Sequence, residues 1–361
     1  MKIIYFLRDI TDCGGIQQTT CNNINSLLVK NQNYVIKTVS LYHSFSKPFF
    51  DLDERVQNIA LFNNQINQYL SFFSIKKQLK KILSEQGYDL LIVQGTAFSI
   101  FLPKGAWNKK VIVCEHGHYG MGTSFGIHAF GKRKALRKAS AIVTLTSADK
   151  DVYLSHNKSS IIVKNIPNCF LPLDFEPSYN SESKIIISVG RLDNIKQFNQ
   201  AIEAAKIVFA QCPDWKWEIY GDGPNKCSLL MQIEESGLTG KVVLCGHQED
   251  KKIVFNNKSF LVLTSKFEGF GMVLLEALQY KLPVISYDVR FGPKEIVQDG
   301  INGYLTPAND VQKLAETVSR MINDKEQRVL LAQNTEKTIE RFSKERVVEE
   351  WIELFETIIN K

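Results

Sequence analysis

The feature that most restricts the fold is a repeated alternation of short apolar runs with segments of helical length. The first half has apolar runs at residues 3–7, 34–41, 90–93, 110–114, 141–145 and 160–163. A second series lies at residues 184–189, 215–220, 241–245, 260–264 and 283–287. Such alternation is typical of parallel sheets covered by helices on both faces. The sequence therefore predicts an α/β chain of two doubly wound, Rossmann-like domains, with ligand sites at the carboxyl ends of the strands and in the cleft between the domains.

A stretch without periodicity separates the two series. Residues 171–183 contain two prolines and two serines that flank Glu182, which is typical of a linker. We predict a first domain over residues 1–170 and a second over residues 171–343, with a terminal helix at 344–361 that could pack back on the first. The length of 361 residues suits two domains of ordinary size.

Composition favours a globular protein with large cores, at 44% hydrophobic and 23% charged residues. No apolar run reaches the roughly 18 residues needed to span a bilayer. Met1 leads straight into an apolar run without the pattern of a signal peptide. Seven cysteines without a C-x-x-C pair indicate reduced thiols. We therefore expect a cytosolic chain.

Residues 259–285 combine a strand, a glycine turn and a helix. The apolar run 260–264 is followed by Lys266-Phe-Glu-Gly-Phe-Gly271, and a helical pattern begins at Met272. The free amide groups and the positive dipole end of a helix N-terminus attract anions, and glycines let a ligand approach closely. This stretch therefore predicts an anion pocket.

Two carboxylates accompany this predicted pocket. Glu268 lies in the turn, and Glu276 lies about five residues into the helix, a rise of about 7 Å. Carboxylates beside an anion pocket are expected if hydroxyl groups flank the phosphates. Glu268 would then reach a group on one side and Glu276 a diol on the other, which is the order of parts in a sugar nucleotide.

Each predicted domain opens with a strand followed by glycine: Gly14-Gly15 in the first and Gly190 in the second. Turn glycines are common, so an ordinary turn remains an alternative for both. Arg191 and Lys196 are more specific, because a forked guanidinium and an ammonium just past a strand suit a diphosphate. The alternative for this pair is two solvated cations, and the presence of Glu268 and Glu276 favours the diphosphate.

These motifs together resemble glycosyltransferase family 4, retaining enzymes with the GT-B fold. In the second half the resemblance rests on Gly190-Arg-Leu-x-x-x-Lys196, Gly221-Asp-Gly-Pro224, Glu268-Gly-Phe-Gly-Met-Val-Leu-Leu-Glu276, Gly292-Pro-Lys-Glu-Ile296 and Asp299-Gly-Ile-Asn-Gly-Tyr-Leu305. In the first half it rests on Gly14-Gly15, Glu115-His116, Thr146-Ser147 and Ile166-Pro-Asn168.

The resemblance implies a role for each matching position. Arg191 and Lys196 match the diphosphate-binding pair; Glu268 matches the glutamate that contacts the donor sugar, and Glu276 the one that holds the ribose. Backbone amides of Phe270, Gly271, Met272 and Val273 would meet the sugar or the distal phosphate. His116 matches a first-domain histidine that reaches the donor sugar across the cleft, and Gly15, next to Gly14, would touch the phosphates when the domains close.

The resemblance also implies catalysis without a bound metal, and the chain lacks a D-x-D triplet at a strand end. The run Cys114-Glu-His-Gly-His118 suggests a metal site at first sight. Only six histidines exist, and no other is patterned as a partner ligand, which favours no metal. For His116, a satisfied histidine at a strand end is the alternative to a donor contact.

Basic residues are concentrated in the first half. Residues 1–172 carry 21 Lys and Arg against 10 Asp and Glu, whereas residues 173–361 carry 23 against 28. Two segments, 72–83 and 132–138, combine lysines or arginines with helical apolar spacing. Each alone is best interpreted as a solvated helix face; with the charge imbalance, shallow contact with an anionic membrane surface is slightly favoured. Neither segment carries a nucleic-acid-binding motif.

The sequence thus predicts a hexosyltransferase. We expect it to move a hexose-type sugar from a nucleotide-diphosphate donor, a UDP-sugar, to a hydroxyl of a growing, lipid-linked glycan in surface polysaccharide biosynthesis. The first domain would bind the acceptor and the second the nucleotide sugar. The alternatives are a UDP-sugar epimerase on the same fold and a catalytically silent subunit that binds glycan or membrane.

Overall fold

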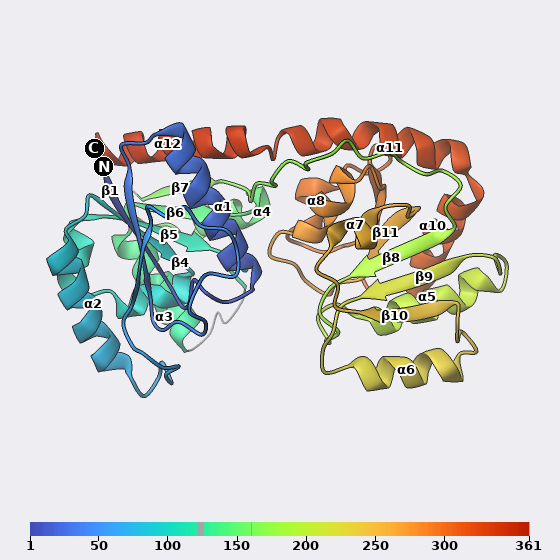
Figure 1. Cartoon of the computed structure of the whole chain (residues 1–361), viewed down its shortest axis with the longest axis horizontal. Helices are drawn as coiled ribbons and strands as arrows, with labels where there is room; N and C mark the ends of the chain where they lie inside the picture. The colour runs from blue at the N-terminus through green and yellow to red at the C-terminus, as the bar shows by residue number, and fades with distance from the viewer. Residues whose placement is uncertain (121–125, 160, 361) are drawn as a thin grey trace. The chain divides into compact units, whose positions relative to one another are not determined.

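The computed structural model describes residues 1–120, 126–159 and 161–360, and it consists of two compact units (Figure 1). Unit 1 comprises residues 1–171 and 343–361, and unit 2 comprises residues 172–342. Each unit is described by itself.

The sheet of unit 1 has seven strands in the order β3-β2-β1-β4-β5-β6-β7. The strands are β1 (Lys2–Leu7), β2 (Val35–Ser40), β3 (Gln57–Ala60), β4 (Leu90–Gln94), β5 (Lys110–Glu115), β6 (Ala141–Thr144) and β7 (Ile162–Asn165). All neighbouring strands pair in parallel. β4 is buried along its whole length, which explains its continuous apolar run. The strand expected from residue 160 begins at Ile162, and residue 160 itself lies outside the described residues.

Helices cover both faces of this sheet. They are α1 (Gly15–Lys30), α2 (Phe72–Gln86), α3 (Ile127–Lys138), α4 (Ser147–His156) and α12 (Lys344–Ile359), with short 3-10 helices η1 (Thr96–Phe101) and η2 (Lys104–Asn108). Ile4 and Phe6 of β1 face the core under α2, whereas Ile3 and Tyr5 face the core under α1 and α12. The terminal helix α12 runs beside α1 (Figure 1) and completes the core on that face.

The sheet of unit 2 has six parallel strands in the order β10-β9-β8-β11-β12-β13. They are β8 (Ile185–Val189), β9 (Lys216–Tyr220), β10 (Val242–Gly246), β11 (Phe260–Leu263), β12 (Val284–Asp288) and β13 (Gly303–Pro307). The helices are α5 (Phe198–Phe209), α6 (Lys226–Glu235), α7 (Lys251–Phe255), α8 (Met272–Gln279), α9 (Pro293–Ile296), α10 (Val311–Asn323) and α11 (Lys325–Glu340).

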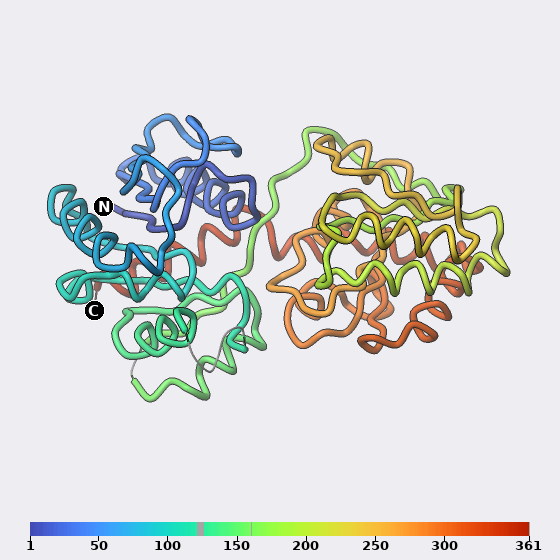
Figure 2. The backbone as a smooth tube through the Cα atoms, turned by 90° about the horizontal axis from the view of Figure 1, so that it is seen from below, coloured from blue at the N-terminus to red at the C-terminus, as the bar shows by residue number. Residues whose placement is uncertain are grey.

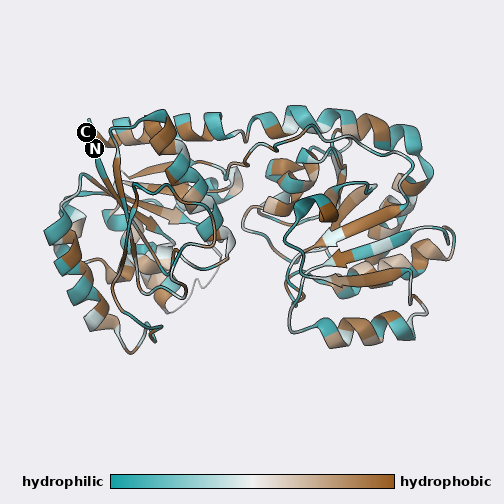
Figure 3. Cartoon of the chain, in the orientation of Figure 1, coloured by the Kyte–Doolittle hydropathy of each residue, from teal (hydrophilic) through white to brown (hydrophobic). Residues whose placement is uncertain are grey.

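The predicted fold class is confirmed, since both sheets are parallel and helices connect most successive strands. Figure 2 follows this winding along the chain, and Figure 3 shows hydrophobic residues concentrated in the strands and on inner helix faces. Two strands, β3 and β13, have no counterpart among the predicted apolar runs. Both are edge strands. Among the described residues, none of the helices combines the length and the apolarity needed to cross a membrane.

We predict that Phe355→Ala, in the core under α12, destabilises unit 1 by about 3–5 kcal/mol, the usual cost of a large cavity at a buried phenylalanine. Amide hydrogen exchange should show the loss of protection in unit 1 and not in residues 172–342. Ile359→Ala, on the exposed end of the same helix, is the matched control and should change little. Equal losses in both units would contradict the assignment of α12 to unit 1.

Candidate functional site

The carboxyl ends of β8 and β11 carry the loops with the predicted donor-binding residues of unit 2. Val189 ends β8, and Gly190 follows. A Cβ added to Gly190 would lie 3.0 Å from Cε of Lys196, so the lysine side chain lies directly over the glycine. Because Gly190 has no side chain, the Lys196 side chain can pack against its backbone at the end of β8.

Lys196 and Glu268 form an ion pair at this edge of the sheet. Nζ of Lys196 lies 2.6 Å from Oε1 of Glu268, with only 19% and 12% of the two side chains exposed. The hydroxyl of Ser265 also donates to this carboxylate oxygen, at 2.6 Å. Two of the residues predicted from sequence are therefore in direct contact.

Backbone contacts join the two loops that carry this pair. The hydroxyl of Thr264 donates to the carbonyl of Lys196 at 2.8 Å, and the amide of Lys266 donates to the carbonyl of Ile195 at 2.7 Å. The loops after β8 and β11 are therefore fixed to each other, and the position of Lys196 depends on both.

This pairing has a chemical consequence for an anion bound nearby. A free carboxylate would repel a phosphate, but Lys196 and Ser265 compensate the charge of Glu268. An ammonium group has three donors, and the contact with Glu268 uses one. Lys196 can therefore hold Glu268 and still bind a phosphate oxygen.

The helix α8 begins at Met272, four residues after Glu268. Its N-cap is Gly271 in the left-handed conformation (φ 95°), which favours glycine. No side chain of the N-cap competes for the first amide groups of the helix, so these donors can bind an anion. The amides of Phe270, Gly271, Met272 and Val273 belong to this helix start.

Gly292 is needed to place this turn. A Cβ on Gly292 would lie 2.8 Å from Cβ of Glu268 and 3.0 Å from the carbonyl oxygen of Phe270. The loop before α9 therefore packs directly against the backbone that carries Glu268. Its glycine belongs to a sequence motif, but only the structure shows what it touches.

Arg191 lies in the loop after β8 and Glu276 lies on α8, and the two side chains have different surroundings. The Arg191 side chain is 73% exposed, with Nε 4.0 Å from a carboxylate oxygen of Asp193, which leaves its guanidinium accessible. Glu276, on α8, is paired with Lys251 at the start of α7, Nζ to Oε1 2.5 Å. Lys251 is a contact that the sequence analysis did not identify.

Two further glycines shape the loop that carries Arg191. A Cβ on Gly221 would lie 1.9 Å from the carbonyl oxygen of Gly190, and a Cβ on Gly223 2.5 Å from that of Leu192. The loops after β8 and β9 therefore touch backbone to backbone, which only glycine permits.

In unit 1, Gly14 is the N-cap of α1 and Gly15 is its first residue. Among the described residues, no heavy atom lies within 4 Å of where a Cβ of Gly15 would stand, so the backbone is open to approach there. An added Cβ at Gly14 would instead meet the side chain of Gln17 at 2.6 Å.

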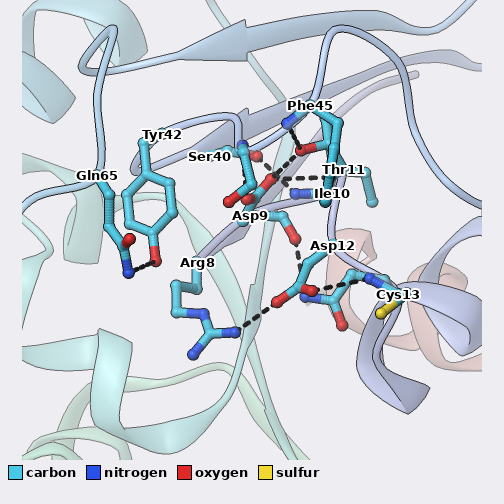
Figure 4. Close-up of polar contacts among 12 residues, drawn as sticks. Arg8, Asp9, Ile10, Thr11, Asp12, Cys13, Ser40, Tyr42, Phe45 and Gln65 are labelled. Atoms are coloured by element: carbon cyan, nitrogen blue, oxygen red, sulfur yellow. Dashed lines mark hydrogen bonds and ion pairs between the residues drawn. The ribbon is translucent and has the colours of Figure 1, made fainter.

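The loop leading to these glycines is held by Asp9, a residue that the sequence analysis missed. The Asp9 carboxylate accepts hydrogen bonds from the amide and hydroxyl of Thr11 and from the amide of Ser44. The amide of Phe45 in turn donates to the Thr11 hydroxyl (Figure 4). Burial alone would raise the pKa of Asp9, but the bonds from Thr11 and Ser44 outweigh it and lower the pKa. Asp9 is therefore an anion that rigidifies the loop before α1.

His116 follows β5, and its Nε2 lies 2.5 Å from Oε1 of Gln94 at the end of β4. Burial lowers the pKa of His116 to about 4, so the ring is neutral at pH 7. A neutral ring can donate one hydrogen bond and accept another. His116 is thus a polar contact group without charge.

Glu115 anchors the backbone that follows His116. Its buried carboxylate accepts hydrogen bonds from the hydroxyls of Thr96 (3.0 Å) and Tyr153 (2.6 Å) and from the amide of Gly117 (3.1 Å). The carboxylate of Asp149 accepts from the amide of Tyr119 at 2.7 Å. These two carboxylates fix the chain after His116, a role that adjacent sequence positions alone do not reveal.

The same contacts explain why residues 114–118 do not gather around one point. Glu115 bonds to Thr96, Tyr153 and Gly117, whereas His116 bonds to Gln94. Cys114 is buried, and that burial raises its pKa strongly. Within the described ranges, no group of three His, Cys, Asp or Glu side chains is arranged to hold a metal ion.

We predict a stability change between pH 6.5 and 4 that depends on His116. The unfolded chain protonates this histidine near its ordinary pKa of 6.5, but the folded chain does so only near 4, so stability is lost as pH falls through this window. In urea unfolding series, His116→Asn should show a shallower loss than the wild type. His128→Asn, at an exposed position of α3, should retain the wild-type slope. Equal slopes for all three would contradict a His116 that stays neutral in the folded chain well below pH 6.5.

Comparison with known proteins adds to this geometry. A family model described as glycosyl transferases group 1 matches residues 173–338. An uncharacterized glycosyltransferase of Haemophilus influenzae is 27% identical over 97% of this chain and 98% of its own length. A Campylobacter jejuni protein, GalNAc-alpha-(1->4)-GalNAc-alpha-(1->3)-diNAcBac-PP-undecaprenol alpha-1,4-N-acetyl-D-galactosaminyltransferase, is 24% identical over 100% of this chain and 99% of its own.

The fold is also that of a solved structure. Anabaena Alr3699/HepE in complex with UDP superposes with a TM-score of 0.78, covering 99% of this chain and 100% of that one at 19% identity. The two Rossmann-like sheets thus correspond to the GT-B fold. The chain therefore belongs to the glycosyl transferases of group 1, the GT4 family of retaining enzymes with the GT-B fold that use nucleotide sugars.

Proposed function

We propose that this glycosyltransferase moves a hexose-type sugar from a UDP-sugar to a hydroxyl of a growing, lipid-linked glycan in surface polysaccharide biosynthesis. The observation that carries the proposal is the Lys196–Glu268 ion pair beside the start of α8. The ammonium group of Lys196 could bind a phosphate, and the carboxylate of Glu268 could accept hydrogen bonds from sugar hydroxyls.

The proposed donor contacts in unit 2 follow from charge and hydrogen-bonding capacity. Arg191 and Lys196 bind the diphosphate and offset the negative charge that develops on it as the glycosidic bond to the donor breaks. The amides of Phe270 to Val273 add uncharged donors. Because these groups together compensate the leaving diphosphate, the proposed reaction needs no divalent metal ion.

The carboxylates are proposed to recognise the sugars on either side of the diphosphate. Glu268, fixed by Lys196 and Ser265, accepts hydrogen bonds from hydroxyls of the transferred sugar. Glu276 accepts from the ribose hydroxyls, and its ion pair with Lys251 orients the carboxylate. Each role needs an ionised acceptor held in one position.

For unit 1 we propose two contacts with the donor. His116, neutral at pH 7, exchanges hydrogen bonds with a hydroxyl of the donor sugar. Gly14 and Gly15 let phosphate oxygens approach the first amides of α1, where the backbone at Gly15 is open.

The uracil nucleotide and the acceptor are supported by similar proteins. HepE was solved with UDP. The name of the Campylobacter relative describes transfer to a glycan linked through a diphosphate to undecaprenol. The excess of 21 Lys and Arg over 10 Asp and Glu in residues 1–172 suits an anionic acceptor of that kind and contact with an anionic membrane face.

We expect UDP-sugars to stabilise the chain more than GDP- or ADP-sugars. Binding to the folded state raises its stability with the logarithm of ligand concentration over the dissociation constant, so one nucleotide series should stand out in thermal-shift measurements. The protein should also hydrolyse sugars of the same nucleotide series slowly, by transfer of the sugar to water. Conversion of UDP-GlcNAc to its C2 epimer without transfer would instead show an epimerase.

We expect Glu268→Gln and Lys196→Ala each to lower kcat/KM for UDP-sugar hydrolysis by about 10²–10³. This is the usual effect of removing one group that stabilises charge developing in the transition state. Lys196→Ala should also weaken UDP binding in calorimetry, since it removes a diphosphate contact. Lys206→Ala, an exposed cation of α5, is the matched control and should be neutral. Wild-type kcat/KM in both site variants would refute the proposed site.

A further inference from the structure

A groove on unit 1 lies between α2 and α3, and its described lining includes none of the residues proposed to bind the donor. Its volume is about 790 Å³. The aromatic and aliphatic part of its lining comes from Tyr69, Phe72, Ile100, Ile127 and Phe130. The helices that form its two walls are labelled in Figure 1.

Large apolar side chains project from the same region into solvent. Leu70 is 87% exposed, Phe73 84% and Phe130 58%. Transfer of such side chains from water to an apolar phase is favourable, and folding of this unit leaves these three in water. Clustered exposure of this kind indicates an interaction surface.

The polar part of the groove is entirely cationic. The described lining includes Lys76, Arg133, Lys134, Arg137 and Lys138, and among these described residues there is no aspartate or glutamate. In the part of the chain that the structure describes, no ion pair joins Arg133, Arg137 or Lys138 to a carboxylate. The groove therefore has positive charge that the described residues do not neutralise.

Lys134 shows that these charges influence one another. Its ammonium donates to the carbonyls of Ile100 and Leu102 at the edge of the groove. Burial, followed by repulsion from Lys76 and Lys138, lowers the pKa of Lys134 to about 8. An anion in the groove would relieve this repulsion.

The structure corrects the prediction that segment 132–138 is a basic, solvated helix face at one position, Lys132. Lys132 belongs to the basic segment 132–138, but its side chain is buried and donates to the carbonyls of His118 and Tyr119. The groove thus draws its charge from α2 as well as from the remaining cations of α3.

We propose that the groove between α2 and α3 docks the chain on an anionic phospholipid bilayer. Leu70, Phe73 and Phe130 enter the interface, while Arg133, Arg137 and Lys138 contact lipid phosphates. A bilayer offers both an apolar phase and a layer of anions, whereas a nucleic acid or an acidic peptide offers no comparable phase for three projecting apolar side chains. This inference rests on the membrane contact included in the proposed function and names the residues that would make it. It does not depend on which nucleotide sugar the protein uses.

The test is flotation of the full chain with vesicles of phosphatidylcholine alone and of phosphatidylcholine mixed with phosphatidylglycerol. We expect binding to the anionic vesicles, weakened by salt, and none to the neutral ones. Equal binding to both kinds of vesicle, or binding to neither, would overturn the proposal.

Variants locate the contact. Phe73→Ser with Phe130→Ser should abolish flotation, and Arg133→Gln with Arg137→Gln should weaken it by about fivefold per removed cation. The matched controls are Leu230→Ser, at an exposed apolar position of α6, and Lys206→Gln, and both should float like the wild type. Wild-type flotation of both groove variants would place the contact elsewhere and refute the groove.

UDP-sugar hydrolysis by the same variants separates this inference from the proposed function. We expect hydrolysis to stay at the wild-type level in the groove variants, which also shows that they fold. If the wild type floats with anionic vesicles but hydrolyses no nucleotide sugar, the proposed function fails and the docking groove stands. If light scattering shows a dimer that Phe73→Ser and Phe130→Ser dissociate, and no vesicle binding occurs, the groove binds a second copy and the proposal is wrong.

Discussion

The proposed donor site of the second unit depends on one ion pair between two loops. Lys196 comes from the loop after β8 and Glu268 from the loop after β11, and the two strands are neighbours in the sheet. Their contact fixes a carboxylate four residues before α8 and partly neutralises its charge. In the proposed site, the pair would allow a carboxylate that binds sugar hydroxyls to lie near a bound diphosphate.

In the first unit, buried carboxylates hold the backbone of the strand-end loops. Backbone amides in strand-end loops lack the regular partners of helices and strands, so those that are buried need other acceptors. Asp9 supplies one before α1, and Glu115 supplies one after β5. Both carboxylates lie close to a predicted ligand-contacting residue, and neither is free to contact a ligand itself. Their contribution is to hold the backbone on which Gly15 and His116 stand.

Close backbone contacts explain much of the glycine pattern. Gly190, Gly221 and Gly292 each stand where an added Cβ would meet another group at 3.0 Å or less. In the sequence these glycines mark turns and match a family pattern. In the structure, Gly221 brings the loop after β9 against the loop after β8 at Gly190, and Gly292 brings the loop after β12 against the loop after β11.

Much of the fold follows from the sequence because most strands are buried and therefore appear as apolar runs. The exceptions have a common cause. β3 and β13 are edge strands; β3 is half-exposed and polar, and β13 begins with glycine and ends with proline, so neither resembles a buried strand. Lys251, the partner of Glu276, was missed because a salt bridge between α7 and α8 leaves no periodic signal.

The sequence by itself determined the fold class, the order of the elements, and the residue types that suit a sugar nucleotide, because hydrophobic periodicity and strand-end glycines are local signals. The tertiary structure alone decided which of these residues meet. It paired Lys196 with Glu268 and Glu276 with Lys251, and it turned Lys132 inward. These are contacts between distant positions, and their geometry is set by packing of whole elements, which no local pattern encodes.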